Sequence, residues 1–231
     1  MEFSELWTFW PLLMTGVVTM LKLLVISGAL GFALAIAVAF ARMSPNRFVA
    51  QLSHGYTELI RGTPLLVQIY LIYYGLGSLF ADWPWLRESV LWPFLRDGFW
   101  YVAFALILSE GAYVGEVVRG GLRAVPRGEI EAARAMGMRP SLVVRRVWLP
   151  RAVQILLPTL AGEVVMLLKS TALASTVAVV DVLGAADYIR AQTLRNYEPL
   201  LAVAVIYIAF AFLIERGFGY VERRVPIRAA R

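Results

Sequence analysis

Polar side chains that could bind a charged solute lie inside long apolar segments of this sequence. Thr159, Glu163 and Ser170 fall within about 40° of one another around a helix, at about 100° per residue, and so share one stripe. A carboxylate at membrane depth needs a cation, a hydrogen-bonding neighbour or water. We therefore predict that the stripe faces a solute pathway, where Glu163 meets an ammonium group or a basic side chain. The alternative is that Glu163 pairs with a residue of another helix and never touches a solute.

Catalytic and metal-binding chemistry find no support in the sequence. The chain has no cysteine and one histidine, His54, so a disulfide framework, a thiolate metal site and multi-histidine ligation are excluded. The phosphate-binding pattern G-x-x-x-x-G-K-[ST] is absent, and the only lysines, Lys22 and Lys169, each follow a leucine. We predict no catalytic residue, no metal and no cofactor bound by this chain.

The composition is that of a membrane protein. Hydrophobic residues make up 60% of the 231 residues and charged residues only 16%, whereas soluble domains carry about 25% charged residues. The net charge of +6 could suggest nucleic-acid binding. The cations lie mostly beside apolar segments, however, which is the pattern that holds one side of a membrane protein in the cytoplasm. We therefore expect membrane lipid and no nucleic acid among the partners.

Five apolar segments are long enough to cross a bilayer as helices, which takes about 20 residues. They lie near 12–41, 56–80, 99–118, 152–180 and 200–219. The predicted fold is all-α, a single polytopic domain over residues 1–231 with about five transmembrane helices. The first segment is too long for the core of a signal peptide, and Glu2 and Glu5 precede it in place of cations. We expect it to be retained as a tilted span.

The arginine distribution predicts the orientation, because cytoplasmic loops retain Lys and Arg. Three connecting segments are rich in arginine, and they follow the first, third and fifth spans: Arg42 and Arg47; Arg119, Arg123, Arg127, Arg134, Arg139, Arg145, Arg146 and Arg151; and Arg216, Arg223, Arg224, Arg228 and Arg231. In the segments 81–98 and 181–199, acidic residues balance the arginines. We predict an outside N-terminus and a cytoplasmic C-terminus.

The segment 119–151 is polar and too long for a simple turn, and it contains a short helix signal. Gly128 can be the N-cap after Pro126, Glu129 and Glu131 lie in the first turn, where the helix dipole favours anions, and Pro140 ends the helix. The residues that share its small, apolar face are Ile130, Ala133, Arg134, Gly137 and Met138. This face could let another protein approach closely. The alternative is an amphipathic helix at the membrane interface.

The same segment resembles the EAA loop of binding-protein-dependent ABC importers, which reads E-A-A, three residues, Gly, nine residues, then I-x-L-P. The matching positions are Glu131, Ala132, Ala133, Gly137, Leu149 and Pro150, with Val147 in place of Ile. The segments 61–75, 112–137 and 170–175 are similar to the polar amino acid branch of these permeases. LWPFLRDG, at 91–98, looks most like the permeases for histidine, lysine, arginine and ornithine, or for the opines octopine and nopaline.

This resemblance implies a type I ABC importer transmembrane domain with a cytoplasmic coupling helix, in a bacterial inner membrane. ATP and Mg²⁺ would be bound by a partner ABC ATPase, which the Glu131–Gly137 helix would contact. The other implied partners are a periplasmic or extracellular substrate-binding protein and a second copy or a homologous permease subunit. The substrate would be an amino acid, with a basic amino acid or an opine favoured.

Two other functions remain open from the residues alone. An ion-coupled carrier would account for Glu110, Glu116, Glu163 and Lys169 in apolar segments, and a structural subunit of a membrane complex would need no solute pathway. Co-purification with an ATPase separates both from an importer. Locally, we predict an ion pair between Glu116 and Arg119, and helix packing at Gly28, Gly31 and Ala35.

Overall fold

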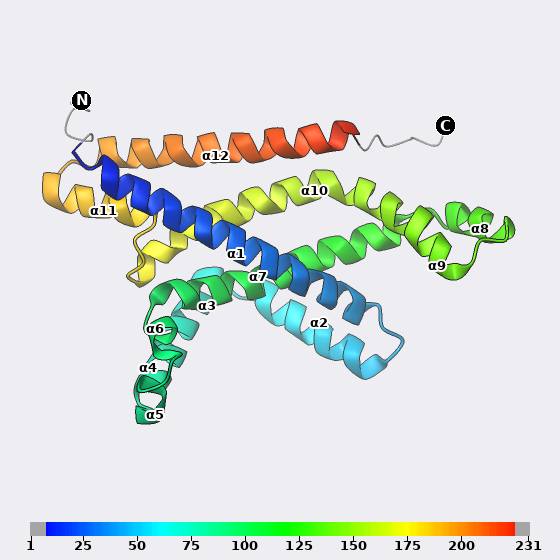
Figure 1. Cartoon of the computed structure of the whole chain (residues 1–231), viewed down its shortest axis with the longest axis horizontal. Coiled ribbons are helices and arrows are strands. Elements are labelled where there is room, and N and C mark those ends of the chain that lie inside the picture. The colour runs from blue at the N-terminus through cyan, green and yellow to red at the C-terminus, as the bar shows by residue number, and fades with distance from the viewer. Residues whose placement is uncertain (1–7, 225–231) are drawn as a thin grey trace.

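The chain is built of helices, as its apolar segments predict (Figure 1). The computed structural model describes residues 8–224, so Glu2, Glu5, Arg228 and Arg231 lie outside the described residues. Four helical segments of this range are long and apolar enough to cross a membrane, and a bent helix pair makes a fifth if it is one span. The four are Trp10–Arg42, Gly98–Ala124, Pro140–Val177 and Tyr197–Arg224; the pair is Arg47–Gly62 with Leu65–Ala81.

The centre of the fold is the packing of α1 (Trp10–Arg42) against α7 (Gly98–Ala124). Small residues make this contact close: a Cβ added to Gly31 would lie 2.5 Å from the Cβ of Glu110, and one added to Gly111 would lie 2.5 Å from Leu34. Ala35 is fully buried in the same contact. Membrane helices associate through such van der Waals packing of small residues. The packing predicted for Gly31 and Ala35 is therefore confirmed.

A sharp bend divides the segment predicted as the second span, 56–80. The helix α2 (Arg47–Gly62) ends there, and the chain turns by 104° into α3 (Leu65–Tyr70), the π-helical turn η2 (Leu71–Leu76) and α4 (Gly77–Ala81). Pro64 forces Thr63 into an extended conformation and has no N–H to donate. The Gln68 amide donates to the Ile60 and Thr63 carbonyl oxygens at 2.7 and 3.1 Å, which satisfies the freed end of α2.

The polar segment 119–151 is mostly helical. Its helices are the end of α7, α8 (Arg127–Ala135), α9 (Pro140–Val143) and the π-helical turn η3 (Val144–Trp148), which runs directly into α10 (Leu149–Ser170). The fourth membrane helix thus begins at Pro140, and not at the predicted start near 152. Arg145, Arg146 and Arg151 made this stretch resemble a loop. Pro150 lies at the start of α10, directly after the π-helical turn η3. Because proline is tolerated at the start of a helix, Pro150 does not break it.

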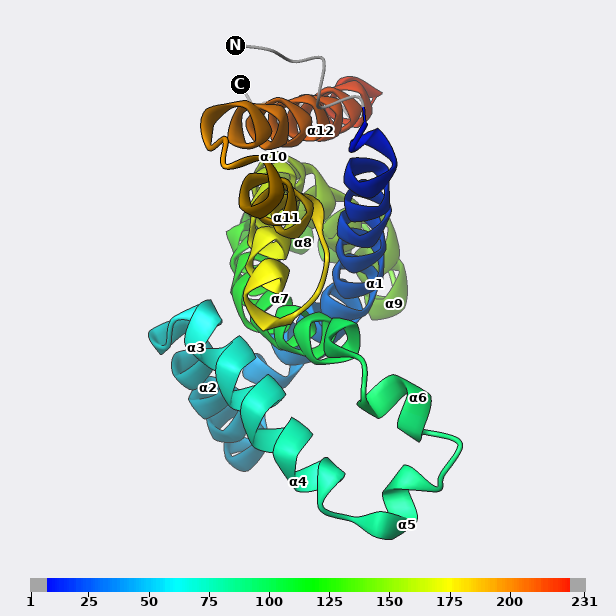
Figure 2. The same cartoon turned by 90° about the vertical axis from the view of Figure 1, so that its left-hand side faces the viewer.

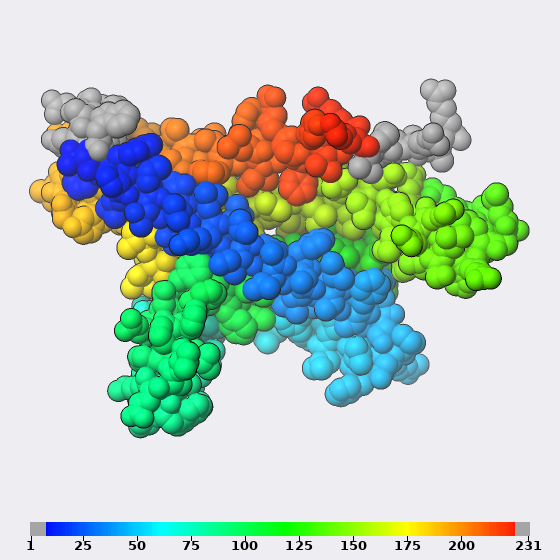
Figure 3. Space-filling view, viewed as in Figure 1, coloured from blue at the N-terminus to red at the C-terminus, as the bar shows by residue number. Residues whose placement is uncertain are grey.

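The remaining elements close the two ends of the bundle. The 3₁₀ helix η4 (Thr171–Val177) and α11 (Val182–Thr193) lie at one end, beside the start of α1 and of α12 (Tyr197–Arg224), and α8 and α9 lie at the other (Figure 1). We call these the α11 end and the α8 end. The short helices α5 (Pro84–Arg87) and α6 (Trp92–Leu95) form, with α4, an arm that projects from the body (Figures 2 and 3).

Candidate functional site

The helix α8, which carries the E-A-A residues, ends in a glycine turn. Gly137 has φ +79°, and its N–H donates to the Arg134 carbonyl oxygen at 2.9 Å, while the N–H of Met138 donates to the Ala133 carbonyl oxygen at 3.2 Å. This is the Schellman arrangement, in which glycine takes the left-handed position after the last helical turn. Two predicted boundaries were wrong: Pro126, and not Gly128, is the N-cap, and Pro140 begins α9. Because α8 begins at Arg127, Glu129 lies in its first turn as predicted, but Glu131 does not.

The two faces of α8 have different surroundings. Ala133 is 6% exposed, and Ile130 packs against the apolar cluster that includes Leu122 and Ala152. The predicted contact face of α8 therefore turns partly toward this chain's own α7 and α10. Glu131 and Ala132 are exposed, and Met136 is 84% exposed. The surface that α8 offers to another protein includes these three residues. Sequence periodicity identified a small face but could not say what covered it.

Two polar contacts join the helices at the α8 end. The indole N–H of Trp148 donates to the carbonyl oxygen of Leu122 in α7 at 2.7 Å. The Arg151 Nε atom lies 3.3 Å from a carboxylate oxygen of Glu129 in α8. Leu149 and Pro150 lie between Trp148 and Arg151, and both are exposed. The residues that carry the resemblance, Glu131, Ala132, Ala133, Gly137, Leu149 and Pro150, thus belong to two helical segments that the structure joins.

A carboxylate between two arginines connects α1 to α7 near the same end. Glu116 accepts from Arg119 at 2.6 Å, as the i, i+3 spacing predicts, and from Arg42 at 2.8 Å. All three side chains are largely buried. The Glu116–Arg119 pair is confirmed. Arg42 was missed as its second partner, because 74 residues separate it from Glu116 and only helix packing brings them together.

A crevice of about 560 Å³ opens between α1, α7, α10 and α12, and two carboxylates line it. They are Glu163 of α10 and Glu110 of α7; the other lining residues are Leu24, Val25, Gly28, Ala29, Phe32, Val114, Leu160, Val164, Leu167 and Phe218. Within residues 8–224, neither carboxylate makes a hydrogen bond or an ion pair. Arg61, at the end of α2, is the cation whose charge acts on Glu163.

The crevice does not contain the whole predicted stripe. Thr159 and Ser170 do not line it, and the Ser170 hydroxyl donates to the Met166 carbonyl oxygen of its own helix at 2.9 Å. Glu163 instead shares the crevice with Glu110, which the sequence analysis named only as a charge that an ion-coupled carrier would account for. The signal for Glu110 was its place in an apolar segment, and pairing it with Glu163 required the tertiary structure.

A fully buried carboxylate, missed by the sequence analysis, organises the α11 end. Asp181 is fully buried; its Oδ1 accepts from the N–H of Gly184 at 2.9 Å, and the Tyr207 hydroxyl of α12 lies 3.4 Å from its Oδ2. In α1, a Cβ added to Gly16 would lie 2.6 Å from the Asp181 carbonyl oxygen. Burial raises the pKa of Asp181 from 3.8 to about 6, against the hydrogen bonds that lower it. Asp181 therefore caps α11 where three helices meet.

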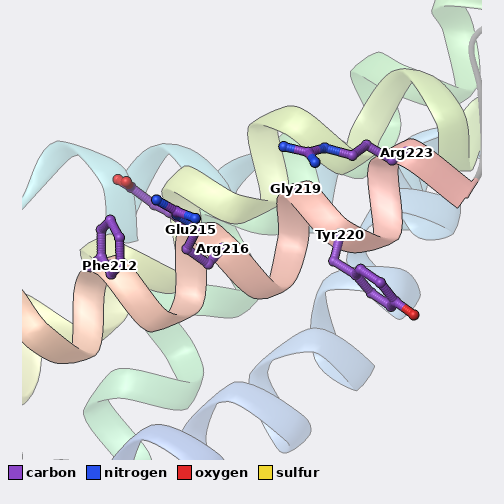
Figure 4. A pocket seen from close by; sticks show the side chains of 6 residues that line it. All are labelled: Phe212, Glu215, Arg216, Gly219, Tyr220 and Arg223. Atoms are coloured by element: carbon purple, nitrogen blue, oxygen red, sulfur yellow. The ribbon is translucent and has the colours of Figure 1, made fainter.

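A shallow groove lies along the last turns of α12, and one helix supplies all its lining residues (Figure 4). They are Phe212, Glu215, Arg216, Gly219, Tyr220 and Arg223. The Arg216 guanidinium lies 4.6 Å from the centre of the Phe212 ring. Because no second element encloses the groove, it is a weak candidate for a solute site. It places arginine side chains on an exposed helix near the α8 end.

No group of three or more His, Asp or Glu side chains in the described part of the chain could hold a metal ion. The candidate positions for binding and coupling are therefore the α8 surface, the carboxylate crevice and the capped α11 end. In the crevice, Glu110 and Glu163 lie beside apolar helices, where carboxylates can bind a cation.

Comparison with curated proteins identifies named relatives over almost the whole chain. The octopine transport system permease protein OccM of Rhizobium meliloti is 42% identical over 217 residues, 94% of this chain and 87% of that protein. The nopaline transport system permease protein NocM of Agrobacterium fabrum is 41% identical, covering 89% and 84%. The histidine/lysine/arginine/ornithine transport system permease protein HisM of Salmonella typhimurium is 37% identical, covering 91% and 88%.

Solved structures agree with these relatives. A crystal structure of an amino acid ABC transporter with histidines matches with a TM-score of 0.83 and 32% identity, over 97% of this chain and 99% of that chain. An inward-facing structure of the MetNI methionine ABC transporter matches with a TM-score of 0.74 at 21% identity, over 98% and 100%, which supports the fold alone.

The family assignment sets aside the ion-coupled carrier and the structural subunit. Residues 29–226 match the family described as binding-protein-dependent transport system inner membrane component. The chain belongs to this family, and is thus a membrane-spanning permease subunit of an ABC importer, with ATP hydrolysis carried out by a separate subunit.

Proposed function

We propose that this chain forms half of the pore of an importer for a cationic amino acid or an opine. The relatives named for octopine, for nopaline and for histidine, lysine, arginine and ornithine support this solute class. The observation that carries the proposal is the crevice that holds Glu110 and Glu163 without a paired cation among the described residues. An ammonium or guanidinium group would supply the opposite charge that two carboxylates at membrane depth need. Thr159 and Ser170, on the same side of α10, would line the pathway beyond the crevice.

Coupling to ATP hydrolysis would run through α8. Glu131, Ala132 and Met136 would contact the ATPase that binds ATP and Mg²⁺, while Ala133 packs inward and Gly137 ends the helix. The contacts of Trp148 with Leu122 and of Arg151 with Glu129 would carry a displacement of α8 into α7 and α10. Leu149 and Pro150 lie at the start of α10, so they would move with it.

The α8 end would face the cytoplasm and the α11 end the outside, in a bacterial inner membrane and within one transmembrane domain. Arginines cluster at the α8 end, from Arg119 to Arg151 and from Arg216 to Arg224, which is where the positive-inside rule puts them. A substrate-binding protein would then deliver the solute at the α11 end. Reporter fusions after Arg47 and Arg139 should both report the cytoplasm. An external signal after Arg139 would reverse the orientation and remove the ATPase contact.

The proposed function is tested with the whole transporter. The chain is co-expressed with its partner ATPase, binding protein and any second permease subunit, reconstituted in proteoliposomes, and assayed for uptake of radiolabelled L-arginine, L-histidine and octopine. ATP-dependent uptake that needs the binding protein, and that an uncharged amino acid such as L-leucine does not inhibit, supports a cationic solute. Uptake that excess L-leucine abolishes would contradict it.

A further inference from the structure

A second polar cavity lies at the α11 end, away from the carboxylate crevice. It has a volume of about 450 Å³ and is formed by one stripe of α1, the start of α7 and the segment between η4 and α11. Its polar side chains are Lys22, Thr15 and Thr19 of α1 and Asp97, the N-cap of α7. Phe99 and Trp100 complete the wall. The residues of α1 that line the carboxylate crevice lie on a different side of that helix.

Lys22 is the unusual member of this group. It lies twelve positions after the first residue of α1, which is about 18 Å along a helix at 1.5 Å per residue. Because the 33 residues of α1 are about 50 Å long, a helix centred on a hydrocarbon core of about 30 Å would place Lys22, four residues before its midpoint, about 6 Å from the midplane. Within residues 8–224, Lys22 makes no ion pair, and its side chain is exposed. A cation at this depth marks a solute or ion pathway far more often than a lipid-facing surface.

The backbone on the opposite wall supports an aqueous cavity. Residues 178–180 are not helical, and Ala178 has φ +57°, a left-handed conformation that alanine rarely adopts. These residues follow directly on Val177, the last residue of the fourth candidate span, and so lie at the α11 end of the membrane helices. Val179 is buried in the apolar core, whereas Val180 is exposed. The segment therefore separates the core from the cavity that Lys22 lines.

The chemistry of the cavity matches a solute that carries both charges. The Phe99 N–H donates to the Oδ1 atom of Asp97 at 2.9 Å. Asp97 and Lys22 make no ion pair with each other. The cavity thus presents a separate cation and a separate anion. The Lys22 ammonium can donate to a solute carboxylate, and the Asp97 carboxylate can accept from a solute ammonium, in charge-assisted hydrogen bonds. The ring of Trp100 can cover the apolar stem of such a solute.

We propose that this cavity is an outer binding site for the transported amino acid or opine, with the solute carboxylate on the Lys22 ammonium and its amino group beside Asp97. The inference rests on the proposed function, because it takes the α11 end as the side where the solute arrives. It adds a carboxylate-recognising site to the cation-recognising crevice. A solute would meet Lys22 before it reaches Glu110 and Glu163.

The cysteine-free sequence permits a direct chemical test of Lys22. Lys22→Cys in the complete transporter should lower L-arginine uptake by about tenfold, the loss expected for one hydrogen bond to a charged group. Treatment with 2-aminoethyl methanethiosulfonate, which attaches an ammonium through a disulfide, should restore most of the uptake. Methyl methanethiosulfonate, which attaches a neutral group, should not. Leu30→Cys, exposed on the same helix and outside both cavities, is the matched control.

Protection of the introduced thiol tests occupancy without relying on transport. L-Arginine should slow modification of the purified Lys22→Cys transporter, and agmatine, which is arginine without its carboxylate, should not. Equal protection by agmatine, restoration of uptake by the neutral reagent, or uptake by Lys22→Cys at the wild-type rate would each overturn the proposal. If phosphatidylglycerol in nanodiscs slows modification of the thiol and L-arginine does not, the site binds a lipid headgroup. That result would also overturn the proposal.

Two controls keep the outcome interpretable. If Lys22→Cys does not co-purify with the ATPase, Thr19→Cys, one turn away with Lys22 intact, is used for the protection assay, and absence of protection by L-arginine then overturns the proposal. A wild-type transporter that does not take up L-arginine would count against the proposed solute class. Protection of the introduced thiol by L-arginine in the Lys22→Cys transporter would still support the site.

Discussion

The indole N–H of Trp148 donates a hydrogen bond of 2.7 Å to the carbonyl oxygen of Leu122, 26 residues earlier in the chain. Trp148 directly precedes α10, and Leu122 lies in the last turn of α7. The bond therefore joins two membrane helices at the end where α8 lies, and Ile130 of α8 packs into the same cluster as Trp148. A movement of α8 would reach both membrane helices through this contact.

Trp148→Phe should weaken coupling more than assembly. Phenylalanine keeps most of the apolar contact but cannot donate, so the Leu122 carbonyl loses its partner at a cost of about 1 kcal/mol. We expect normal co-purification with the ATPase and a several-fold rise in ATP hydrolysed per solute transported. The measurement is ATPase rate against uptake in the same proteoliposomes. An unchanged ratio would mean that the bond plays no part in coupling.

Gly137 should tolerate asparagine better than alanine. Nothing lies within 4 Å of a Cβ added there, so the expected cost comes from φ +79° and not from crowding within this chain. Residues other than Gly and Asn hold this conformation at a cost of about 1–2 kcal/mol. Uptake should fall in the order Gly, Asn, Ala, Val, with the protein still inserted in the membrane. If Gly137→Asn and Gly137→Ala lower uptake equally, the loss comes from contact with the ATPase and not from backbone strain.

Glu131→Lys should abolish transport without destabilising the isolated permease. Glu131 is exposed and makes no ion pair within the described residues, so its replacement removes no internal contact. The lysine would reverse the charge that the exposed face of α8 offers to the ATPase. Loss of ATPase co-purification at an unchanged melting temperature is the expected result. Glu129→Gln, which weakens the contact with Arg151, should instead lower the melting temperature.

Glu163→Gln should reduce uptake of a cationic solute while assembly and basal ATP hydrolysis persist. The amide keeps the shape and hydrogen bonding of the carboxylate but removes its charge, which leaves Glu110 as the only acid lining the crevice among the described residues. Glu110→Gln is the matched variant on α7. Normal uptake by Glu163→Gln would exclude a charge contact with the solute. A failure to assemble would favour a structural role for Glu163.

Because of Asp181, the permease should be more stable at mildly acidic pH than at neutral pH. Its pKa is raised to about 6 in the folded protein, so between about pH 4 and pH 6 the folded state binds more protons than the unfolded state. Stability is then lost as pH rises through this window, by at most about 3 kcal/mol at 1.36 kcal/mol per pKa unit. Asp181→Asn, which can still cap α11, should flatten the dependence of the melting temperature on pH between about 4.5 and 7. A slope equal to that of the wild type would assign the effect to another group.

The sequence alone determined the class of protein and the place of the segment that carries the E-A-A residues. Apolar segments of about 20 residues can satisfy their backbone in a bilayer only as helices, which made the all-α prediction independent of tertiary contacts. The E-A-A residues are contiguous, so their spacing could be recognised without a structure. Glu116 and Arg119 are one turn apart, and local helix geometry was enough to pair them.

Tertiary packing decided everything that depends on residues distant in the chain. Helix boundaries in 119–151 were misplaced because arginines at helix ends resemble loop residues, although they lie on continuous helices. The bend of 104° within the predicted span 56–80 was missed, and after it α3 packs against α7. Glu110 and Glu163 share a crevice, and Lys22 shares a cavity with Asp97, because close packing of α1 on α7 sets which side chains meet. Periodicity assigns a residue to a face of its helix, and only the packed helices determine what that face meets.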